Sequence, residues 1–182
     1  MTTITDTTDN PAPDWTDQVD AALAAVGNAV APTFASQLAP SPALEGMLKQ
    51  GEALRLTPYR LGDGGATLGY GRYFPDGGTS PPAGIDQAIA DAWFADDIEA
   101  RAARWVRAYV TAPIVQTQFD ALCSMAYNLR PASFRTIADA VNVGNDPGDA
   151  AMQFIRAGTN LENGLRNRRA RELDLYRNGV YA

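Results

Sequence analysis

Residues 51–73 (GEALRLTPYRLGDGGATLGYGRY) bring two carboxylates and a hydroxyl into one glycine-rich stretch. We expect Glu52 at the end of a helix, Asp63 in a glycine turn, and Thr67 on a strand that faces back toward the glutamate. A carboxyl at a helix end beneath a sheet is partly desolvated, which raises its pKa and keeps it protonated near neutral pH. Such an acid can protonate the leaving oxygen of a glycosidic bond. On position alone, a surface ion pair is the more common role of a single glutamate.

The chain has no histidine, and this excludes several classes of hydrolase. Ser-His-Asp and Cys-His catalysis and zinc hydrolysis through histidine ligands all need an imidazole. The single cysteine, Cys123, cannot form an internal disulfide and lies in an apolar run, which favours a small buried side chain over a nucleophile. Acid–base catalysis in this chain therefore falls to carboxylates.

The net charge of −6 is unevenly distributed along the 182 residues. The first 20 residues hold five aspartates, and no basic residue precedes Lys49. The remaining 16 acids (21 − 5) nearly balance all 15 bases, of which five arginines gather near the C-terminus. That arginine cluster either attracts an anionic polymer or, as the more ordinary interpretation, forms ion pairs on a solvated helix face. Its members are Arg166, Arg168, Arg169, Arg171 and Arg177.

The predicted elements give an α+β fold with segregated parts. Ser41 and Pro42 are a helix N-cap and first helical residue, and they open a helix that runs to about Glu52. Two strand-like pieces follow, at residues 54–59 and 66–73, and from there helical periodicity dominates. The predicted helices span residues 86–110, 115–129, 134–143, 149–157 and 162–176. We expect a small glycine-rich β lobe, a larger helical lobe and a cleft between them.

Residues 1–40 differ in composition from the rest and are predicted to lie outside the domain formed by residues 41–182. Residues 1–13 are rich in Thr, Asp and Pro, residues 15–30 carry apolar side chains at helical spacing, and residues 31–42 contain three prolines. We interpret them as a tail, a possible docking helix and a linker; a helix packed on its own domain is the alternative. Neither a secretory signal nor a membrane-spanning segment is visible.

The segment from Glu52 resembles the phage-type lysozymes, glycoside hydrolase family 24. Their motif is Glu-Gly-Leu-Arg-Leu-x-x-Tyr-x-Asp-x-x-Gly-x-x-Thr-Ile-Gly-x-Gly-His. The positions that match without a gap are Glu52, Leu54, Arg55, Leu56, Tyr59, Gly64, Thr67, Gly69 and Gly71. The segments 119–128 and 163–176 resemble the family's central and closing helices, so the resemblance covers roughly residues 44–181.

The resemblance implies that Glu52 is the general acid and that Thr67 positions a water. The family's catalytic aspartate falls on Leu61, which cannot act as a base or a nucleophile. Our hypothesis is that Asp63, two residues later, does this work; the alternative is that Asp63 is only a turn residue. The family's histidine is Arg72 here, and an arginine can keep an ion pair between the lobes.

The family's cleft-facing positions fall on Tyr73, Tyr127 and Gln153, which could contact substrate or could equally pack the lobes.

The implied reaction is hydrolysis of the β-1,4 bond between N-acetylmuramic acid and N-acetylglucosamine in bacterial peptidoglycan, with inversion and without a metal or other cofactor. We expect synthesis in a host bacterial cytoplasm, followed by release to the periplasm as an endolysin or incorporation into a phage tail through residues 1–40. No nucleic-acid partner and no membrane insertion are predicted. The alternative function is a virion structural or wall-binding protein that keeps the fold but has lost activity, as Leu61 permits.

Overall fold

The computed structural model describes residues 31–181. The predicted docking helix at residues 15–30 lies outside the described residues. The chain separates into two compact units, Met1–Ala31 and Pro32–Ala182, and only the second is described below. This unit begins at Pro32 rather than at residue 41, because residues of the expected linker pack on the helices. The backbone of Thr33 pairs with that of Ile114, and Ala35, in the short 3-10 helix η1 (Ala35–Gln37), is 1% exposed.

The first α-helix of this unit, α2 (Pro42–Gln50), begins as the sequence predicted. The Ser41 side chain accepts a hydrogen bond of 3.2 Å from the backbone N–H of Leu44, and Pro42 occupies the first turn, where its missing N–H costs nothing. The helix ends at Gln50 with Gly51 as its C-cap, so Glu52 is the second residue after the helix. The cap and the helix end thus fix where the candidate acid leaves the helix.

Three antiparallel strands form the sheet, in the order β1 (Arg55–Tyr59), β2 (Gly65–Gly69) and β3 (Arg72–Pro75). The prediction of one strand over residues 66–73 was wrong, because the chain reverses direction between β2 and β3. Gly69 (φ 67°) and Gly71 (φ 99°) adopt the left-handed backbone conformation that this tight reversal requires. The reversal places the β2–β3 turn beside Glu52, whose Oε2 lies 3.9 Å from where a Cβ on Gly71 would be.

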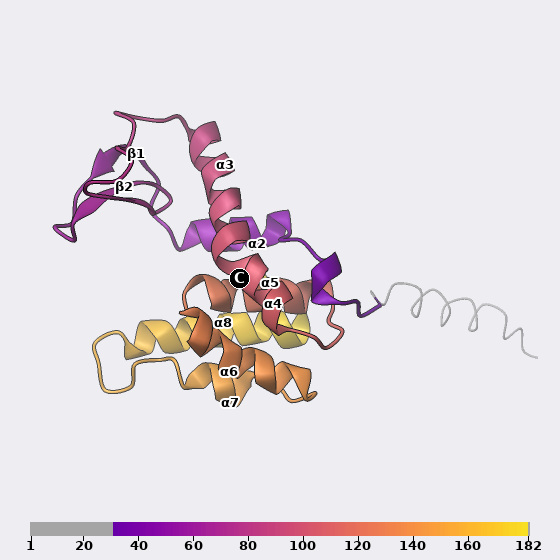
Figure 1. Cartoon of the computed structure of the whole chain (residues 1–182). Helices are drawn as coiled ribbons and strands as arrows, with labels where there is room; N and C mark the ends of the chain where they lie inside the picture. The colour runs from indigo at the N-terminus through magenta and orange to yellow at the C-terminus, as the bar shows by residue number, and fades with distance from the viewer. Residues whose placement is uncertain (1–30, 182) are drawn as a thin grey trace, which may run out of the picture. The chain divides into compact units, whose positions relative to one another are not determined.

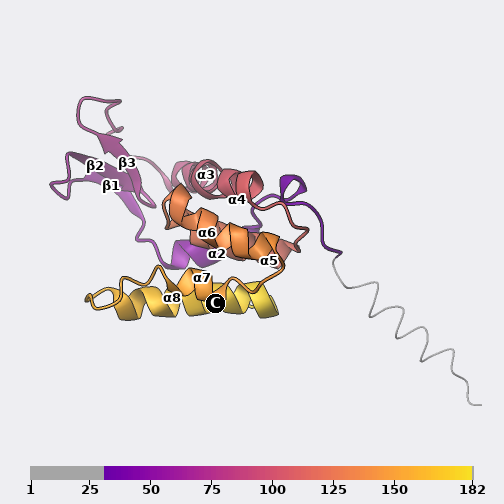
Figure 2. The same ribbon diagram turned by 60° about the horizontal axis from the view of Figure 1, so that its bottom comes forward.

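The helical part follows the predicted order. One continuous helical stretch consists of α3 (Gln87–Ile98), the π-helical turn η2 (Glu99–Ala103) and α4 (Arg104–Tyr109). The remaining helices are α5 (Gln116–Tyr127), α6 (Pro131–Asn142), α7 (Gly148–Met152) and α8 (Glu162–Asn178). In Figures 1 and 2, α3 runs from beside the sheet to the other helices, and α8 lies along α5. No helix among residues 31–181 is both long enough and apolar enough to cross a bilayer.

The core is centred on α5, whose residues Phe119–Tyr127 are all buried. Phe119, Leu122 and Met125 are fully buried there, and each contributes roughly 1.5–3 kcal/mol through the apolar surface it removes from water. Cys123 is buried in the same cluster, as the apolar run predicted, and burial raises the pKa of its thiol well above the usual value. Helix α5 is therefore held in the core along most of its length, and it contributes Ser124 to the candidate site.

Candidate active site

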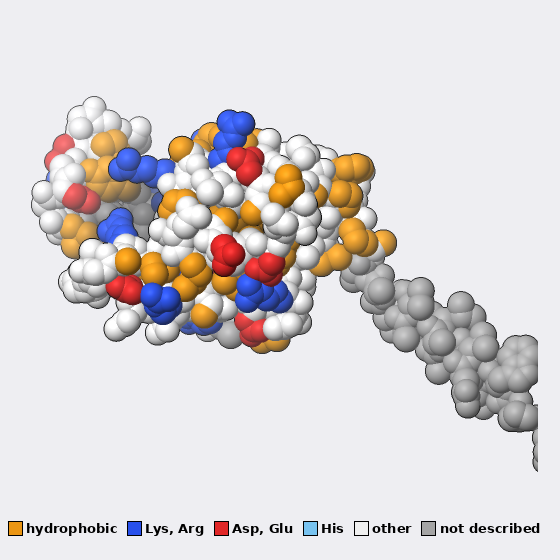
Figure 3. Space-filling model, turned by 90° about the horizontal axis from the view of Figure 1, so that it is seen from below, with side chains coloured by type: hydrophobic (Ala, Val, Ile, Leu, Met, Phe, Trp, Pro, Cys, Tyr) orange, Lys and Arg blue, Asp and Glu red, His pale blue; other side chains and the backbone are white. Residues whose placement is uncertain are grey.

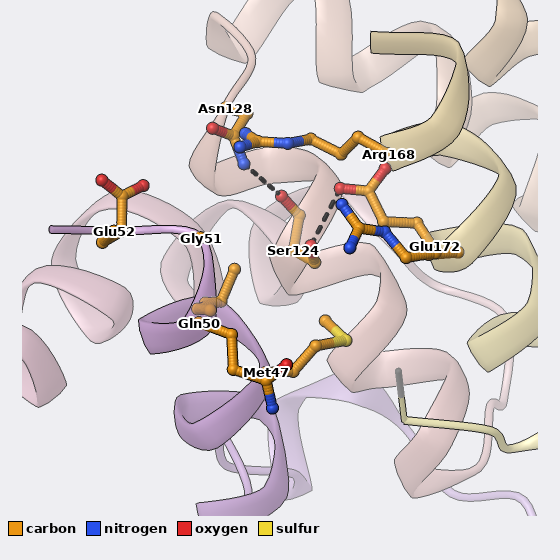
Figure 4. A pocket seen from close by; sticks show the side chains of 10 residues that line it. Met47, Gln50, Gly51, Glu52, Ser124, Asn128, Arg168 and Glu172 are labelled. Atoms are coloured by element: carbon orange, nitrogen blue, oxygen red, sulfur yellow. Dashed lines mark hydrogen bonds between the residues drawn. The ribbon is translucent and has the colours of Figure 1, made fainter. Parts of the chain in front are cut away.

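Glu52 lines a pocket of about 250 Å³ between the end of α2 and the helices α5 and α8. We call it the Glu52 pocket, and Figure 4 shows its side chains. The residues that line it are Met47, Leu48, Gln50, Gly51, Glu52, Ser124, Asn128, Arg168, Arg171 and Glu172. One wall is formed by α2 and by the two residues that follow it, Gly51 and Glu52. The opposite wall is formed by α5 and α8. A ligand in this pocket would thus contact residues from three separate helices.

Burial is the main influence on the acidity of Glu52. The side chain is half-buried, and desolvation raises the pKa of its carboxyl above the usual value. The positive charges of Arg168 and Arg101 act in the opposite direction but do not cancel this effect. The result is a carboxyl whose protonated form persists to higher pH than that of an ordinary glutamate, as general acid catalysis requires. The direction of this shift in the pKa of Glu52 agrees with the one expected from the sequence.

Arg101 acts on Glu52 from the π-helical turn η2. Its guanidinium lies 4.7 Å above the ring of Tyr127. Burial raises the pKa of the Tyr127 hydroxyl; the charge of Arg101 lowers this pKa and that of Glu52 raises it. A π turn adds one residue to a helical turn, so the side chains after it point in directions that a regular α-helix would not give. Arg101 is itself a residue of this turn, and its charge is close enough to act on the candidate acid.

Tyr127 is mainly a residue of the hydrophobic core. It is 8% exposed, and its ring packs edge-on against Phe94 with the centroids 5.9 Å apart. So small an exposed area leaves little of the ring for a sugar to cover. Of the two roles considered for Tyr127, the geometry favours packing over substrate contact.

Glu172, which lines the Glu52 pocket, belongs to a buried ion pair on α8. Nη1 of Arg169 lies 2.6 Å from Oε2 of Glu172, and both side chains are almost fully buried. The Ser124 hydroxyl donates a hydrogen bond of 2.8 Å to Oε1 of Glu172, which Figure 4 shows as a dashed line. Burial raises the pKa of the Glu172 carboxyl even with Arg169 and Ser124 beside it. The hydrogen bond between Ser124 and Glu172 links α5 to α8.

Arg72 connects the sheet to α3, as the arginine in place of the family's histidine was expected to do. Its Nε and Nη2 donate to the two carboxylate oxygens of Asp97 at 3.1 and 2.9 Å, and Nη2 also donates to the carbonyl of Trp93 at 2.9 Å. The guanidinium also lies 4.9 Å from the centre of the Trp93 ring. The acid that the sequence left unidentified is therefore Asp97.

Thr67 lies in the middle of β2, between Tyr59 of β1 and Tyr73 of β3, and is 8% exposed. Residues paired across antiparallel strands point to the same face, so these three side chains share one face of the sheet. Tyr73 is 44% exposed and covers Gly65 on that face. Neither Thr67 nor Tyr73 lines the Glu52 pocket.

Asp63 and Leu61 lie in the connection between β1 and β2, and both are exposed. The hydroxyl of Tyr73 donates a hydrogen bond of 3.0 Å to the backbone carbonyl of Asp63, which connects this turn to β3 through a single contact of the main chain. Leu61 is 72% exposed. The structure does not bring Asp63 into the Glu52 pocket, so the role proposed for it is not settled by the geometry of this pocket.

Gln153 is exposed directly after α7 and lines a second pocket, which shares Asn128, Arg168 and Arg171 with the Glu52 pocket. The sequence did not single out Arg168 within the C-terminal arginine cluster. A signal was present, because Arg168 and Arg171 are three residues apart and so share one helix face. For Arg101 the sequence offered no signal, because its position depends on the π turn.

A small sheet beside a helical bundle, with a desolvated glutamate at the end of a helix between them, is the architecture of a lysozyme-like protein. The chain belongs to the phage lysozyme family, whose sequence profile matches residues 49–172.

Relatives among known proteins are phage endolysins. The endolysin of Bacillus phage PZA is 34% identical over 141 residues, which are 74% of this chain and 53% of that protein. The endolysin of Acyrthosiphon pisum secondary endosymbiont phage 1 is 31% identical over 122 residues, 66% of this chain and 80% of that protein. The chain thus spans only about half the length of the Bacillus phage relative.

Solved structures share the fold over almost their whole length. The endolysin of Escherichia coli O157:H7 phage FAHEc1 aligns with a TM-score of 0.66 and 28% identity, covering 80% of this chain and 98% of that one. The muramidase domain of SpmX from Asticaccaulis excentricus aligns with a TM-score of 0.63 and 29% identity, covering 75% and 96%. These alignments confirm the predicted fold class.

Proposed function

We propose that this chain is a peptidoglycan hydrolase that cleaves the β-1,4 bond between N-acetylmuramic acid and N-acetylglucosamine. The observation that carries the proposal is the half-buried carboxyl of Glu52, which lines a pocket beside the sheet and has a raised pKa. The similarity to phage endolysins over about two thirds or more of the chain supports the same function.

In this mechanism Glu52 donates its proton to the oxygen that leaves the anomeric carbon. A water attacks that carbon from the opposite face of the sugar ring and gives up its proton to a base, so that the configuration inverts. We assign the placement of this water to Thr67, a buried residue in the middle of β2 whose hydroxyl can hydrogen-bond a water. We assign the base to Asp63, which lies between Gly62 (φ 80°) and Gly64 (φ 86°), two residues whose backbone freedom would let the turn move.

Leu61 favours a second candidate function, a wall-binding protein of impaired activity. Its exposed aliphatic side chain occupies the sequence position where a second carboxylate is expected, and Asp63 lies outside the Glu52 pocket. A glycosidase with one effective carboxylate would be slow, because the attacking water would lack a base.

Digestion of purified peptidoglycan followed by analysis of the new sugar ends separates the two candidates. The hydrolase yields reducing N-acetylmuramic acid, formed with inverted configuration, and Asp63→Asn lowers its turnover by about a hundredfold or more. Asp76→Asn is the matched control, since Asp76 is another exposed turn aspartate, paired with Arg60. Unchanged turnover in Asp63→Asn would remove the base from this mechanism. Anhydro sugar ends would indicate a transglycosylase. The absence of any new sugar ends would favour the second candidate, the wall-binding protein of impaired activity.

We further propose that the acidic N-terminal segment joins the enzyme to virion proteins, on the basis of its composition. Residues 33–39 belong to the described unit and contact its helical part, as in the hydrogen bond of 2.9 Å from Arg107 Nε to the carbonyl of Leu38. The test is therefore a deletion of residues 1–31 rather than 1–40. Hydrolysis should persist while incorporation into virions is lost; loss of hydrolysis would assign the segment to the enzyme.

A further inference from the structure

The second pocket, of about 700 Å³, adjoins the Glu52 pocket along Asn128, Arg168 and Arg171. It is bounded by the loop between α5 and α6, the segment after α7, and the first half of α8. Figure 3, which views the molecule from below, shows Lys and Arg side chains beside the hollow between the sheet and the helices. The side chains that line this second pocket are strongly biased in charge.

Five arginines and no acidic residue line this pocket, which we call the arginine pocket. The five are Arg130, Arg156, Arg168, Arg169 and Arg171. Among residues 31–181, only Arg169 of these five forms a salt bridge, whereas Arg166 and Arg177 on the same helix are paired with Glu162 and Asp146. Of the acidic residues that the structure describes, only Glu52 and Glu172 act on arginines of this set, and five arginines facing two carboxylates leave an excess of positive charge, which an anionic occupant would relieve.

Arg169 gives the pocket a buried donor with unmet hydrogen bonds. The residue is 1% exposed, and although Nη1 lies close to Glu172, neither Nε nor Nη1 has an aligned hydrogen-bond acceptor within the described part of the chain. Leaving buried donors unsatisfied costs roughly 1–3 kcal/mol each, more for charged groups. An anionic occupant of the arginine pocket would add a second negative charge near this buried guanidinium.

Arg156 is held in an uncommon backbone conformation at the same pocket. Its φ of 50° makes it the one non-glycine residue of the described chain with a positive φ. The hydroxyl and backbone N–H of Thr159 donate to its carbonyl at 2.7 and 3.2 Å and fix the turn. Such strain concentrates where a structure positions a side chain for binding. The turn adds Arg156 to the lining of the pocket.

We propose that the arginine pocket is an anion-binding site for a carboxylate or phosphate group of the bacterial wall polymer whose sugars occupy the Glu52 pocket. This inference rests on the proposed function for the identity of the polymer. The wall offers two sources of such anions, the peptides attached to its sugars and its phosphate-bearing polymers. A group attached to a sugar in the Glu52 pocket would meet the arginine pocket first, because the two share walls.

Arg168 couples the two pockets. It lines both, and its charge lowers the pKa of Glu52. Figure 4 shows its side chain extending from α8 toward Asn128. An anion bound to Arg168 would offset that charge, and the protonated form of Glu52 would then persist to higher pH. Filling the arginine pocket would therefore favour the state of Glu52 that donates a proton.

The test is calorimetric binding to the full chain carrying Glu52→Gln, so that no ligand is cleaved. Three probes are compared: a disaccharide peptide of the wall, the same compound with its carboxylates amidated, and inorganic phosphate. The test variant adds Arg130→Gln and Arg156→Gln, which line only the arginine pocket. The control adds Arg135→Gln and Arg166→Gln, which change the charge equally but line neither pocket.

The test variant should weaken binding of the charged probes by about tenfold, and the control by less than about twofold. Loss of affinity on amidation assigns the pocket to peptide carboxylates. Binding of phosphate with no effect of amidation assigns it to a phosphate-bearing polymer. The proposal is overturned if no charged probe binds, or if both double variants change affinity equally. Because binding is measured without turnover, these outcomes would decide the role of the pocket even in a protein that lacks hydrolase activity.

Discussion

Replacing Arg72 by methionine tests how firmly the sheet is held to α3. Methionine keeps much of the apolar stem of arginine but removes the charge and its hydrogen bonds. In the structure Arg72 makes a bidentate pair with Asp97, one hydrogen bond to a Trp93 carbonyl, and a cation–π contact with the Trp93 ring. Each of these contacts joins β3 to α3, so their loss should lower the free energy of unfolding and loosen the sheet.

The magnitude follows from the sum of these contacts. All three hydrogen bonds are donated by the charged guanidinium and contribute about 1.5–3 kcal/mol each before solvent screening, and the cation–π contact contributes about 0.5–1 kcal/mol. The side chains of Arg72 and Asp97 are 26% and 18% exposed, so water partly screens the pair and partly solvates Asp97 once Arg72 is gone. We therefore expect a net loss of about 2–3 kcal/mol, which lowers Tm by roughly 5–10 °C in a chain of this size.

The assay is thermal and urea unfolding followed by circular dichroism. Arg60→Met is the matched control, because Arg60 pairs with Asp76 on the same lobe but the two side chains are 63% and 56% exposed. The control should change stability by no more than about 0.5 kcal/mol. A double-mutant cycle with Asp97→Asn isolates the pair itself. If Arg72→Met were no more destabilising than Arg60→Met, the connection between the lobes would not depend on this arginine.

Two further predictions concern acidity and packing. Arg101→Gln removes a positive charge that lowers the pKa of Glu52, so the alkaline limb of the pH profile of kcat/KM should move to higher pH. The control is Arg104→Gln, because the guanidinium of Arg104 stacks on Trp105 instead. This control should leave the alkaline limb in place. A limb that moved to lower pH in Arg101→Gln would contradict the assigned electrostatics. Gly65→Ala places a Cβ 2.5 Å from the backbone of β3 and should cost about 2 kcal/mol in urea unfolding. Gly46→Ala, in open space on α2, should instead stabilise by about 0.5–1 kcal/mol; equal effects of the two would refute the packing argument.

Local signals in the sequence were sufficient for the elements that hold Glu52. The Ser41–Pro42 cap and the helix end at Gly51 depend only on neighbouring residues, and both confirmed the prediction. The reversal between β2 and β3 was missed because the apolar pattern continues through residues 66–73. Gly69 and Gly71 carried the signal, since two glycines this close are typical of a turn with positive φ.

The parts of the site that could not be predicted depend on distant packing. Asp97 follows Arg72 by 25 residues, and several other acids on the same predicted helix were equally possible partners. Arg101, in the π turn, contacts Tyr127, which follows it by 26 residues in the chain. The expected linker proved to be part of the compact unit, because an extended, proline-containing segment can run over a surface as readily as it can join two units.

The most direct test of the account compares the hydrolysis of purified peptidoglycan by the wild-type chain, Glu52→Gln and Glu45→Gln. Glu45 is the matched control, a glutamate of α2 that pairs with Lys49 and does not line the Glu52 pocket. With unchanged Tm in both variants, Glu52→Gln should lose activity by about a hundredfold to ten-thousandfold, and Glu45→Gln should keep it. If Glu52→Gln hydrolysed peptidoglycan as fast as Glu45→Gln, Glu52 would not be the general acid.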